Sequence, residues 1–213
     1  MEADATISPT NMNIPVIVDP ASKAVSVDKS YLDSLDTEKN DELKLQLEHL
    51  NEFARNLVGV NGDVPPPSNV ITESISQQVN KLKESASKAS KAGKGAEAIK
   101  FYNLAMQMAL KRNHWEATQY VIEELCGILA PRADLYMAQG LWPEAYTDSG
   151  LLVILKGMDP KNQYRKGRCL QTIGKWSEAR AAYQAALSLQ PQNAEFKSSL
   201  QEVDSLLENG GSS

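Results

Sequence analysis

The stretch GKWSEARAAYQAALSLQP, residues 174–191, decides the fold because two other segments repeat its pattern. All three segments begin with Gly-X-X-X-Glu-Ala and continue into a helix-like run. The other two are GKGAEAIKFYNLAMQMA (93–109) and GLWPEAYTDSGLLVIL (140–155). The shared alanines are Ala98, Ala145 and Ala179, and the last two are 34 residues apart. Self-similarity at such a period indicates a stack of repeated structural units.

A period of 34 residues is typical of the tetratricopeptide repeat (TPR), a pair of antiparallel helices. Three segments resemble the TPR pattern of small and aromatic positions. In the first repeat the matching residues are Ala86, Ala98, Tyr102 and Ala105; in the second Ala133, Tyr136 and Ala145; in the third, counted from Pro160, Gly167, Ala179, Tyr183, Ala186 and Pro191. The second repeat has Ser149 and Leu152 at its later positions. We therefore predict a mainly α-helical fold with a three-repeat TPR domain over 71–208.

The second repeat and the C-terminal end depart from the simple period. Ala98 and Ala145 are 47 residues apart, which is 13 more than one repeat. The excess falls in 114–140 and predicts a lengthened first helix, bent near Pro131, because proline lacks a backbone donor. After Pro191, apolar residues recur on one face up to residue 208, as in the capping helix of an open-ended stack. We expect 209–213 to be a disordered tail.

The N-terminal part has a different pattern. Residues 1–12 are expected to be disordered, and two β-rich runs follow between residues 16 and 27. A lone hairpin is marginal in water, so it either packs on the following helices or receives a strand from another chain. Apolar residues at helical spacing predict a helix over 38–60, and NGDVPPPSN (61–69) ends it. We predict that 13–65 form a hairpin and helix that bind a partner.

Composition argues against several functions. The net charge of −5 is unlike that of most nucleic-acid-binding proteins. The longest apolar run, at 151–155, is far shorter than the roughly 20 residues that a membrane-spanning helix needs. The start MEADATISPT lacks the apolar core of a secretory signal. Cys126 and Cys169 lie in helix-like segments, which favours buried free thiols over a disulfide and suits a reducing compartment.

Side chains for catalysis are scarce. The two histidines, His49 and His114, are expected in different domains, which favours neither a His-based metal site nor a catalytic triad. No glycine-rich phosphate loop occurs, and the carboxylates resemble those of solvated helical faces. An enzyme confined to the N-terminal segment would have few catalytic side chains. We therefore predict a protein that binds other proteins without catalysis, cofactor or metal.

The helix predicted to begin at Asp159 carries an unusual charge pattern. Asp159 suits an N-cap and Pro160 a first helical position. The helix dipole then favours acids, yet Lys161, Arg165 and Arg168 follow. At about 100° per residue, these three cations lie within about 60° of one another. We expect this stripe to face the peptide-binding groove and Tyr164 to face the core. The alternative is a set of solvated surface charges.

The stripe resembles the carboxylate clamps of TPR domains that bind the Glu-Glu-Val-Asp tails of cytosolic heat-shock chaperones. Carried over by the repeat count, the clamp positions fall on Lys83, Ser87, Pro131, Lys161 and Arg165. The three cations match, whereas Ser87 and Pro131 replace two asparagines. The resemblance implies a non-standard clamp that binds a peptide carboxylate through Lys83, Ser87, Lys161, Arg165 and the neighbouring Arg168. Ser87 offers one hydroxyl donor and Pro131 offers none.

Three longer segments resemble one family more specifically. They are KRNHWEA (111–117), RADLYMAQGLWPEAYTDSGLLV (132–153) and YRKGRCLQTIGKWSEARAAYQAALSLQPQN (164–193). They look like the small TPR-bearing peripheral subunit of the fungal Sec complex for post-translational translocation at the endoplasmic reticulum. The resemblance implies a non-enzymatic adaptor on the cytosolic face of that membrane, held through its N-terminal region by a membrane-anchored partner subunit. It also implies that the groove docks the tail of a seventy-kilodalton heat-shock chaperone. The alternative is a freestanding co-chaperone or scaffold.

Overall fold

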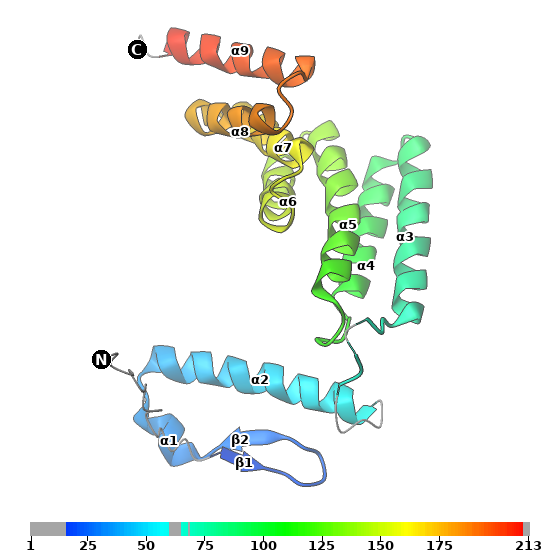
Figure 1. The fold of residues 1–213 in the computed structure, drawn as a ribbon, viewed down its shortest axis with the longest axis vertical. Helices are drawn as coiled ribbons and strands as arrows, with labels where there is room; N and C mark the ends of the chain where they lie inside the picture. Colours follow the sequence, from blue (N-terminus) through cyan, green and yellow to red (C-terminus); the bar gives the residue numbers. More distant parts are fainter. Residues whose placement is uncertain (1–15, 60–64, 68, 211–213) are drawn as a thin grey trace, which may run out of the picture. The chain divides into compact units, whose positions relative to one another are not determined.

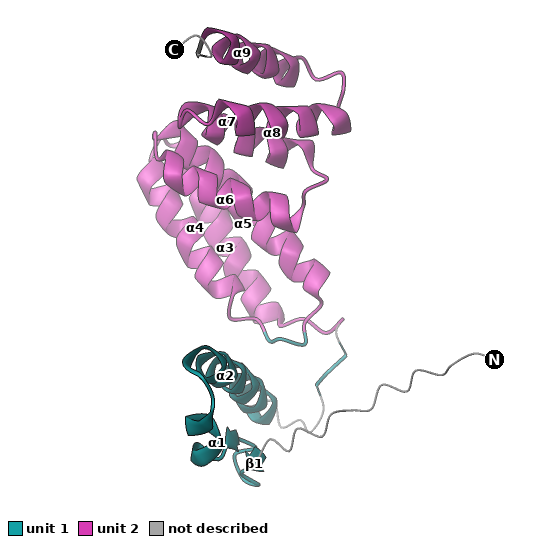
Figure 2. Cartoon of the chain, turned by 90° about the vertical axis from the view of Figure 1, so that its left-hand side faces the viewer, with its two compact units in different colours: residues 1–67, 113–115 teal, residues 68–112, 116–213 magenta. Residues whose placement is uncertain are grey.

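A computed structural model describes residues 16–59, 65–67 and 69–210, in two compact units (Figure 1; Figure 2). Unit 1 comprises 1–67 and 113–115, and unit 2 comprises 68–112 and 116–213. The disorder expected over 1–12 lies outside the described residues, as does part of the predicted break at 61–69.

Unit 1 contains a two-stranded hairpin and two helices. Strand β1 (Val16–Val18) pairs antiparallel with β2 (Val25–Val27). In the turn between them, Asp19 Oδ1 accepts the backbone N–H groups of Ala21 and Ser22 at 3.0 and 2.6 Å. Such side-chain bonds to nearby backbone stabilise tight turns.

One asparagine fixes the hairpin to the long helix α2 (Thr37–Gly59). Asn51 Oδ1 accepts the backbone N–H of Val25 at 2.6 Å, and Asn51 Nδ2 donates to the Val25 carbonyl at 2.8 Å. The amide thus pairs with both polar groups of one β2 residue, as a neighbouring strand would. The hairpin was expected either to pack on a following helix or to receive a strand from another chain. The structure shows the first, because the hairpin packs on α2.

A short helix, α1 (Lys29–Ser34), precedes α2, and the sequence analysis missed it. Asp28 caps α1 by accepting the backbone N–H of Ser30 at 2.8 Å. The helix has six residues and none is buried, so its apolar periodicity is too short to be recognised.

Unit 2 is a stack of three helical hairpins and a final helix (Figure 2). The hairpins are α3 (Glu73–Lys91) with α4 (Gly95–Ala109), α5 (Thr118–Ala138) with α6 (Trp142–Leu155), and α7 (Pro160–Thr172) with α8 (Trp176–Leu189). They are followed by α9 (Ala194–Gly210), which packs on α8. This confirms the predicted mainly α-helical fold of three repeats and a capping helix. Helix α9 continues into the expected tail, so the predicted disorder is wrong for 209–210, while 211–213 lie outside the described residues.

The repeated glycine of the sequence signature ends the first helix of each repeat. Gly93, Gly140 and Gly174 have φ values of 74°, 73° and 81°, in the left-handed region that costs glycine least. The residue after each glycine donates its backbone N–H to a carbonyl in the last turn of the helix at 2.9 Å. These bonds are Lys94 to Ala89, Leu141 to Tyr136 and Lys175 to Leu170. All three turns are therefore Schellman-type helix stops, built from the same local signal.

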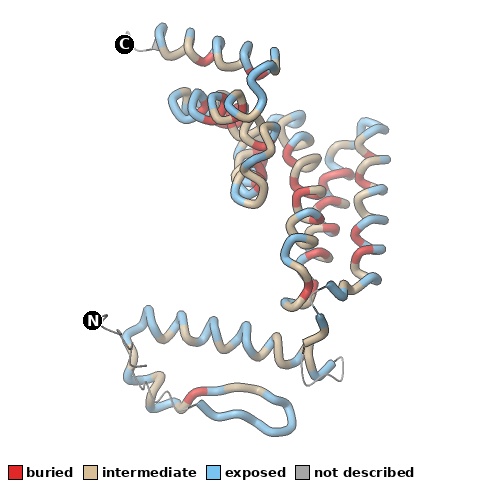
Figure 3. Tube along the Cα trace, in the orientation of Figure 1, coloured by how far each residue is buried: buried red, intermediate tan, exposed pale blue. Residues whose placement is uncertain are grey.

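The small residues of the repeat pattern form the core (Figure 3). Seven of the alanines named above are fully buried: Ala86, Ala98, Ala105, Ala133, Ala145, Ala179 and Ala186. Tyr183 is also fully buried. Ser149 and Leu152, the departures in the second repeat, are buried too, and the Ser149 hydroxyl donates to the Ala145 carbonyl at 2.6 Å. Cys126 and Cys169 are buried free thiols, as predicted, and burial raises the pKa of both.

The 13-residue excess of the second repeat is divided between a helix and a loop. Helix α5 has 21 residues against 13 in α7 and contains Pro131, so the lengthened helix is confirmed. Most of the remainder lies in the loop 110–117, where helix was predicted for residues 114–117.

Arg112 explains the path of this loop. Its side chain is 2% exposed, and its Nε and Nη2 each donate to a carboxylate oxygen of Glu124 at 2.8 Å. Its Nη1 donates to Glu116 at 2.6 Å, and its Nη2 also donates to Ser76 Oγ at 2.8 Å. The guanidinium carbon lies 4.8 Å from the centre of the Tyr120 ring. Buried contacts of Arg112 with Glu116, Glu124 and Ser76, which are 4, 12 and 36 positions away, therefore hold the loop, and helical periodicity does not reveal the two longer ones.

Glu116 is the loop's own contribution to these ion pairs. Burial by itself would raise the pKa of its carboxyl group. Hydrogen bonds from Thr72, at 2.7 Å, and from Arg112 outweigh burial and hold the pKa below its usual value. Glu116 is therefore ionised at neutral pH, as its pairing with Arg112 requires.

The residues between Arg112 and Glu116 belong to unit 1. The ring centres of Trp115 and His114 lie 5.7 and 6.5 Å from that of Phe53, both edge-on. His49 and His114 are thus in the same unit, and the prediction that they lie in different domains is wrong. The chain returns to unit 1 after two helices of unit 2, which a single linear boundary near 61–69 does not anticipate. No group of three metal-ligating side chains occurs among the described residues.

Candidate peptide-binding site

Helix α7 begins as its sequence predicts. Asp159 is the N-cap, and its Oδ1 accepts the backbone N–H of Lys161 at 2.9 Å. Pro160 is the first helical residue. Lys161, Arg165 and Arg168 then follow at spacings of four and three residues, which put them on one face of the helix.

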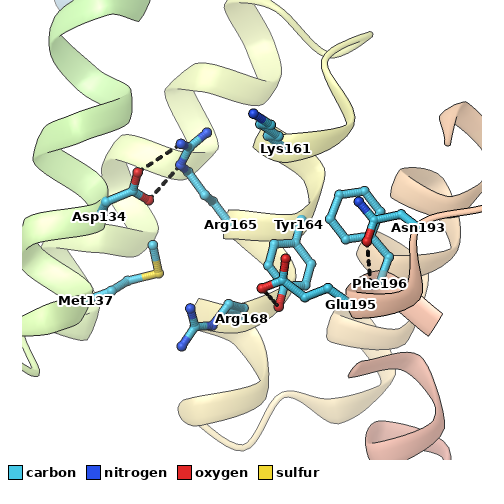
Figure 4. Close-up of a pocket in the computed structure, with 9 residues that line it drawn as sticks. All are labelled: Asp134, Met137, Lys161, Tyr164, Arg165, Arg168, Asn193, Glu195 and Phe196. Atoms are coloured by element: carbon cyan, nitrogen blue, oxygen red, sulfur yellow. Dashed lines mark hydrogen bonds and ion pairs between the residues drawn. The ribbon is translucent and has the colours of Figure 1, made fainter. Parts of the chain in front are cut away.

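These three cations line one cavity of about 230 Å³ (Figure 4). Lys161 and Arg168 are exposed, and neither side chain forms a hydrogen bond or ion pair within the described part of the chain. The other lining residues come from α5, α7, the turn before α9 and the first turn of α9. They are Asp134, Met137, Tyr164, Asn193, Glu195 and Phe196. The cavity therefore combines unpaired positive charge with an apolar wall.

Arg165 differs from its two neighbours because it already holds a carboxylate. Its Nε and Nη2 donate to the two oxygens of Asp134, on α5, at 2.8 and 2.9 Å. Its Nη1 donates to Asn162 Oδ1 at 3.2 Å. The Arg165 side chain is 17% exposed and that of Asp134 is 50% exposed. The bonds to Asp134 outweigh burial and raise the pKa of Arg165.

Tyr164 forms part of the apolar wall. Its ring stacks on Phe196, with centres 4.7 Å apart, and its hydroxyl donates to Glu195 Oε1 at 3.0 Å. Burial is the main cause of a raised Tyr164 pKa. Tyr164 packs on the core beside Tyr183, as predicted, but its ring also lines the cavity of the cations, so the expectation that the core side points opposite to them is wrong for this residue. It follows Lys161 by three residues and precedes Arg168 by four, which is the spacing of a single helical face.

The first-repeat residues of the predicted clamp do not line this cavity. Lys83 reaches toward α5 at Gly127, where an added Cβ would lie 3.0 Å from Lys83 Nζ. Gly127 precedes Asp134 by seven residues, or about 10 Å along an ideal helix. Ser87, one turn after Lys83 on α3, is half-buried. Pro131, at a clamp asparagine position, lies between Gly127 and Asp134. The structure thus brings together Lys161, Arg165 and Arg168, and leaves Lys83 and Ser87 outside their cavity.

Sequence reasoning missed the cavity residues from other helices. Asp134 is 31 positions from Arg165, and no local pattern connects them. A usable signal did exist for Asp134, because it follows Pro131 by three residues and so shares its face of α5. Phe196 belongs to the apolar face predicted for the capping helix, and the same side chain also lines the cavity.

Unit 1 carries a second candidate surface. Val16, Ile17 and Val18 of β1 are 53%, 55% and 54% exposed. No residue of α2 is buried (Figure 3). A cavity of about 350 Å³ lies between the hairpin and α2, lined by Lys23, Val25, Leu50, Phe53, Ala54, Leu57 and Val58. An open apolar cavity beside an exposed strand is typical of a protein-binding surface.

None of the helices in the described residues is both long and apolar enough to cross a membrane. The tetratricopeptide-repeat family model matches residues 160–193, which are α7, α8 and the turn after them. Translocation protein SEC72 of Saccharomyces cerevisiae is 32% identical over 172 residues, covering 80% of this chain and 84% of that protein. The ER protein translocation subcomplex subunit sec67 of Schizosaccharomyces pombe is 33% identical over 144 residues, covering 66% of this chain and 75% of that protein.

Two solved structures are similar. One is a chain of the Sec complex from S. cerevisiae, with a TM-score of 0.74 and 26% identity, covering 91% of this chain and 98% of that chain. The other is the first TPR of Spaghetti (RPAP3) bound to the HSP90 peptide SRMEEVD. Its TM-score is 0.51 and its identity 28%, covering 62% of this chain and 94% of that chain. The first similarity extends over both units, and the second over less of the chain.

Proposed function

Because the chain belongs to the family of the SEC72 and sec67 translocation subunits, we propose that it is a non-catalytic adaptor of protein translocation at the endoplasmic reticulum. Its TPR unit docks the acidic C-terminal tail of a cytosolic heat-shock chaperone of the seventy-kilodalton class, which delivers polypeptides for post-translational import. Its N-terminal region, 13–65, binds a membrane-anchored subunit of the Sec complex. This contact holds the protein peripherally on the cytosolic face of the membrane.

The observation that carries the docking proposal is the pair of unpaired cations in the α7 cavity. Lys161 and Arg168 flank Arg165, and all three side chains reach the same space (Figure 4). A peptide carboxylate that binds there would accept charge-assisted hydrogen bonds, which are roughly twice as strong as neutral ones. The wall of Met137, Tyr164 and Phe196 would accept an apolar side chain of the same peptide. The similar RPAP3 domain binds a peptide with such a tail.

We expect a short peptide ending in Glu-Glu-Val-Asp to bind about tenfold more tightly as the free acid than as the C-terminal amide, because amidation removes one charge-assisted contact of about 1.5 kcal/mol. Lys161→Ala should lower the affinity for the free acid by about the same factor and leave the amide nearly unchanged. Fluorescence anisotropy of the labelled peptides, with the full chain, measures both effects.

Lys166→Ala is the matched control, because Lys166 lies on the same helix but does not line the cavity. It should leave both affinities unchanged within about twofold. If the free acid and the amide bind equally well to the wild type, the carboxylate proposal fails.

The N-terminal proposal is supported by the apolar surface of unit 1. The amide of Asn51 pairs with β2, whereas β1 has no second strand partner among the described residues. An extended segment of another chain could add to the edge of β1 that β2 does not occupy. The cavity beside Leu50 and Val58 lies on the β2 side, against α2, and could receive an apolar side chain from another part of the same partner. The partner would then supply the burial that α2 lacks by itself.

We expect Leu50→Glu to reduce co-purification with the detergent-solubilised Sec complex at least tenfold, because it places a charge in the apolar cavity. Leu45→Glu is the matched control. Both leucines are about half exposed, at 46% and 52%, but Leu45 lies about 140° around α2 and outside the cavity. Equal retention of the two variants would contradict the proposal and favour a freestanding co-chaperone or scaffold.

A further inference from the structure

The ion pair between Arg165 and Asp134 limits what the α7 cavity can bind. A guanidinium recognises a carboxylate best through two parallel N–H groups, and Arg165 directs its Nε and Nη2 pair at Asp134 (Figure 4). The pair is held in place on its other side as well. Arg165 Nη1 donates to Asn162, which is 2% exposed and donates to the carbonyls of Leu152 and Lys156 at 3.4 and 3.1 Å. Arg165 is therefore oriented and neutralised within the chain.

The charges of the cavity are accordingly reduced. Three cationic and two acidic side chains line it, and one acid, Asp134, contacts a cation directly. The other acid, Glu195, accepts the hydroxyl of Tyr164 instead. Lys161 and Arg168 remain as unpaired cations, seven residues or about 10 Å apart along α7. Arg165 lies between these two in α7 and is held by Asp134, so a second carboxylate of the same terminal residue finds no free charge at the centre of the stripe.

We propose that Asp134 is a specificity-determining residue of this site, because it occupies Arg165 with an internal carboxylate. The cavity then binds a C-terminal peptide through its main-chain carboxylate and does not depend on an acidic side chain at the last residue. The ligand class is therefore broader than tails that end in aspartate and includes tails that end in a neutral polar residue. This inference rests on the proposed function of the cavity and concerns the same ligands.

The test compares two free-acid peptides that differ only in the last residue, ending in Glu-Glu-Val-Asp and in Glu-Glu-Val-Asn. The wild type should bind them within about threefold of each other. Asp134→Asn, which removes the internal charge and keeps the side-chain shape, should bind the aspartate peptide about tenfold more tightly than the asparagine peptide. Adding Arg165→Ala to Asp134→Asn should abolish that preference, because Arg165 would be the group released.

Glu195→Gln is the matched control, because it removes the cavity's other acid, which contacts no cation in the described structure. It should increase the affinity for both peptides by the same factor.

A wild type that already prefers the aspartate peptide tenfold would overturn the inference. So would a weaker binding of both peptides by Asp134→Asn, which would make Asp134 a positioning residue for Arg165. Neither result would affect the difference between free acid and amide, on which the proposed function depends. Loss of that difference would overturn both proposals.

Discussion

Replacing Arg112 by methionine is expected to lower the free energy of unfolding by about 3–5 kcal/mol, the cost of breaking a buried ion pair by removing one partner. Arg112 donates to Glu116 and Glu124 at 2.6 and 2.8 Å, and both carboxylates are nearly inaccessible, with side-chain exposures of 0% and 6%. Methionine keeps much of the side-chain volume but offers no donor. Two negative charges would then remain buried without their cation. Urea denaturation of the full chain at pH 7.5 measures the change.

The pH dependence of this variant gives a second readout. In the wild type, the lowered pKa of Glu116 contributes stability that is present above the usual pKa of glutamate and is lost as the pH falls through the folded value. Without Arg112, burial raises the pKa of the Glu116 carboxyl group. In acid this group is buried in its neutral form, so the destabilisation caused by an unpaired buried charge becomes smaller. The difference between variant and wild type should therefore shrink between about pH 6 and pH 4.

Arg180→Met is the matched control for this experiment. Arg180 pairs with Asp204 at 2.6 Å, but the two side chains are 49% and 38% exposed. An exposed pair of this kind contributes at most about 1 kcal/mol. If Arg112→Met were no more destabilising than Arg180→Met, the loop ion pairs would not determine the stability of this region.

Gly167→Ala is expected to lower the free energy of unfolding by about 2–3 kcal/mol through overpacking. An added Cβ would lie 2.5 and 2.6 Å from Cε1 and Cδ1 of Tyr183. That ring is fully buried and cannot move aside, because its hydroxyl donates to Gln171 at 2.7 Å and Tyr164 packs against it. The backbones of α7 and α8 must therefore separate. The midpoint of denaturant unfolding measures the loss.

The same substitution elsewhere provides the control with the opposite sign. Gly150 lies within α6, and a Cβ there would meet nothing within 4 Å. Gly150→Ala should therefore stabilise the chain by about 0.5–1 kcal/mol, through helix propensity alone. Combining Gly167→Ala with Tyr183→Leu should recover part of the loss, because the smaller side chain vacates the space. A Gly167→Ala variant as stable as the wild type would show that the two helices have room to adjust.

Features that depend on residues close together in the chain were predicted well. The Gly-X-X-X-Glu-Ala signature marks a helix stop and the start of the next helix, and all three stops form with the same backbone bonds. Asp159 and Pro160 begin α7 as expected. The common face of Lys161, Arg165 and Arg168 follows from helical geometry alone. Such features are predictable because their partners lie within about five residues.

The features that were missed depend on partners far apart in the chain. Arg112 meets Ser76 across 36 positions, and Asn51 meets Val25 across 26. In the loop that replaces the helix predicted over 114–117, Arg112 binds Glu116 together with Glu124 and Ser76, which are 12 and 36 positions away. The same segment, KRNHWEA, is one of the three that carry the family resemblance. Only the three-dimensional structure shows the role of its residues, which is the buried pairing of Arg112 and Glu116.

The sequence by itself therefore determined the repeat architecture, the helix boundaries at each glycine and the cationic face of α7, because local propensity and periodicity control these features. Only the tertiary structure decided which of those cations are available to a ligand. Arg165 is paired with Asp134 from the neighbouring repeat, while Lys161 and Arg168 are unpaired among the described residues. The strength of an ion pair depends on distance and burial in space. Neither quantity can be read from positions 31 residues apart in the chain.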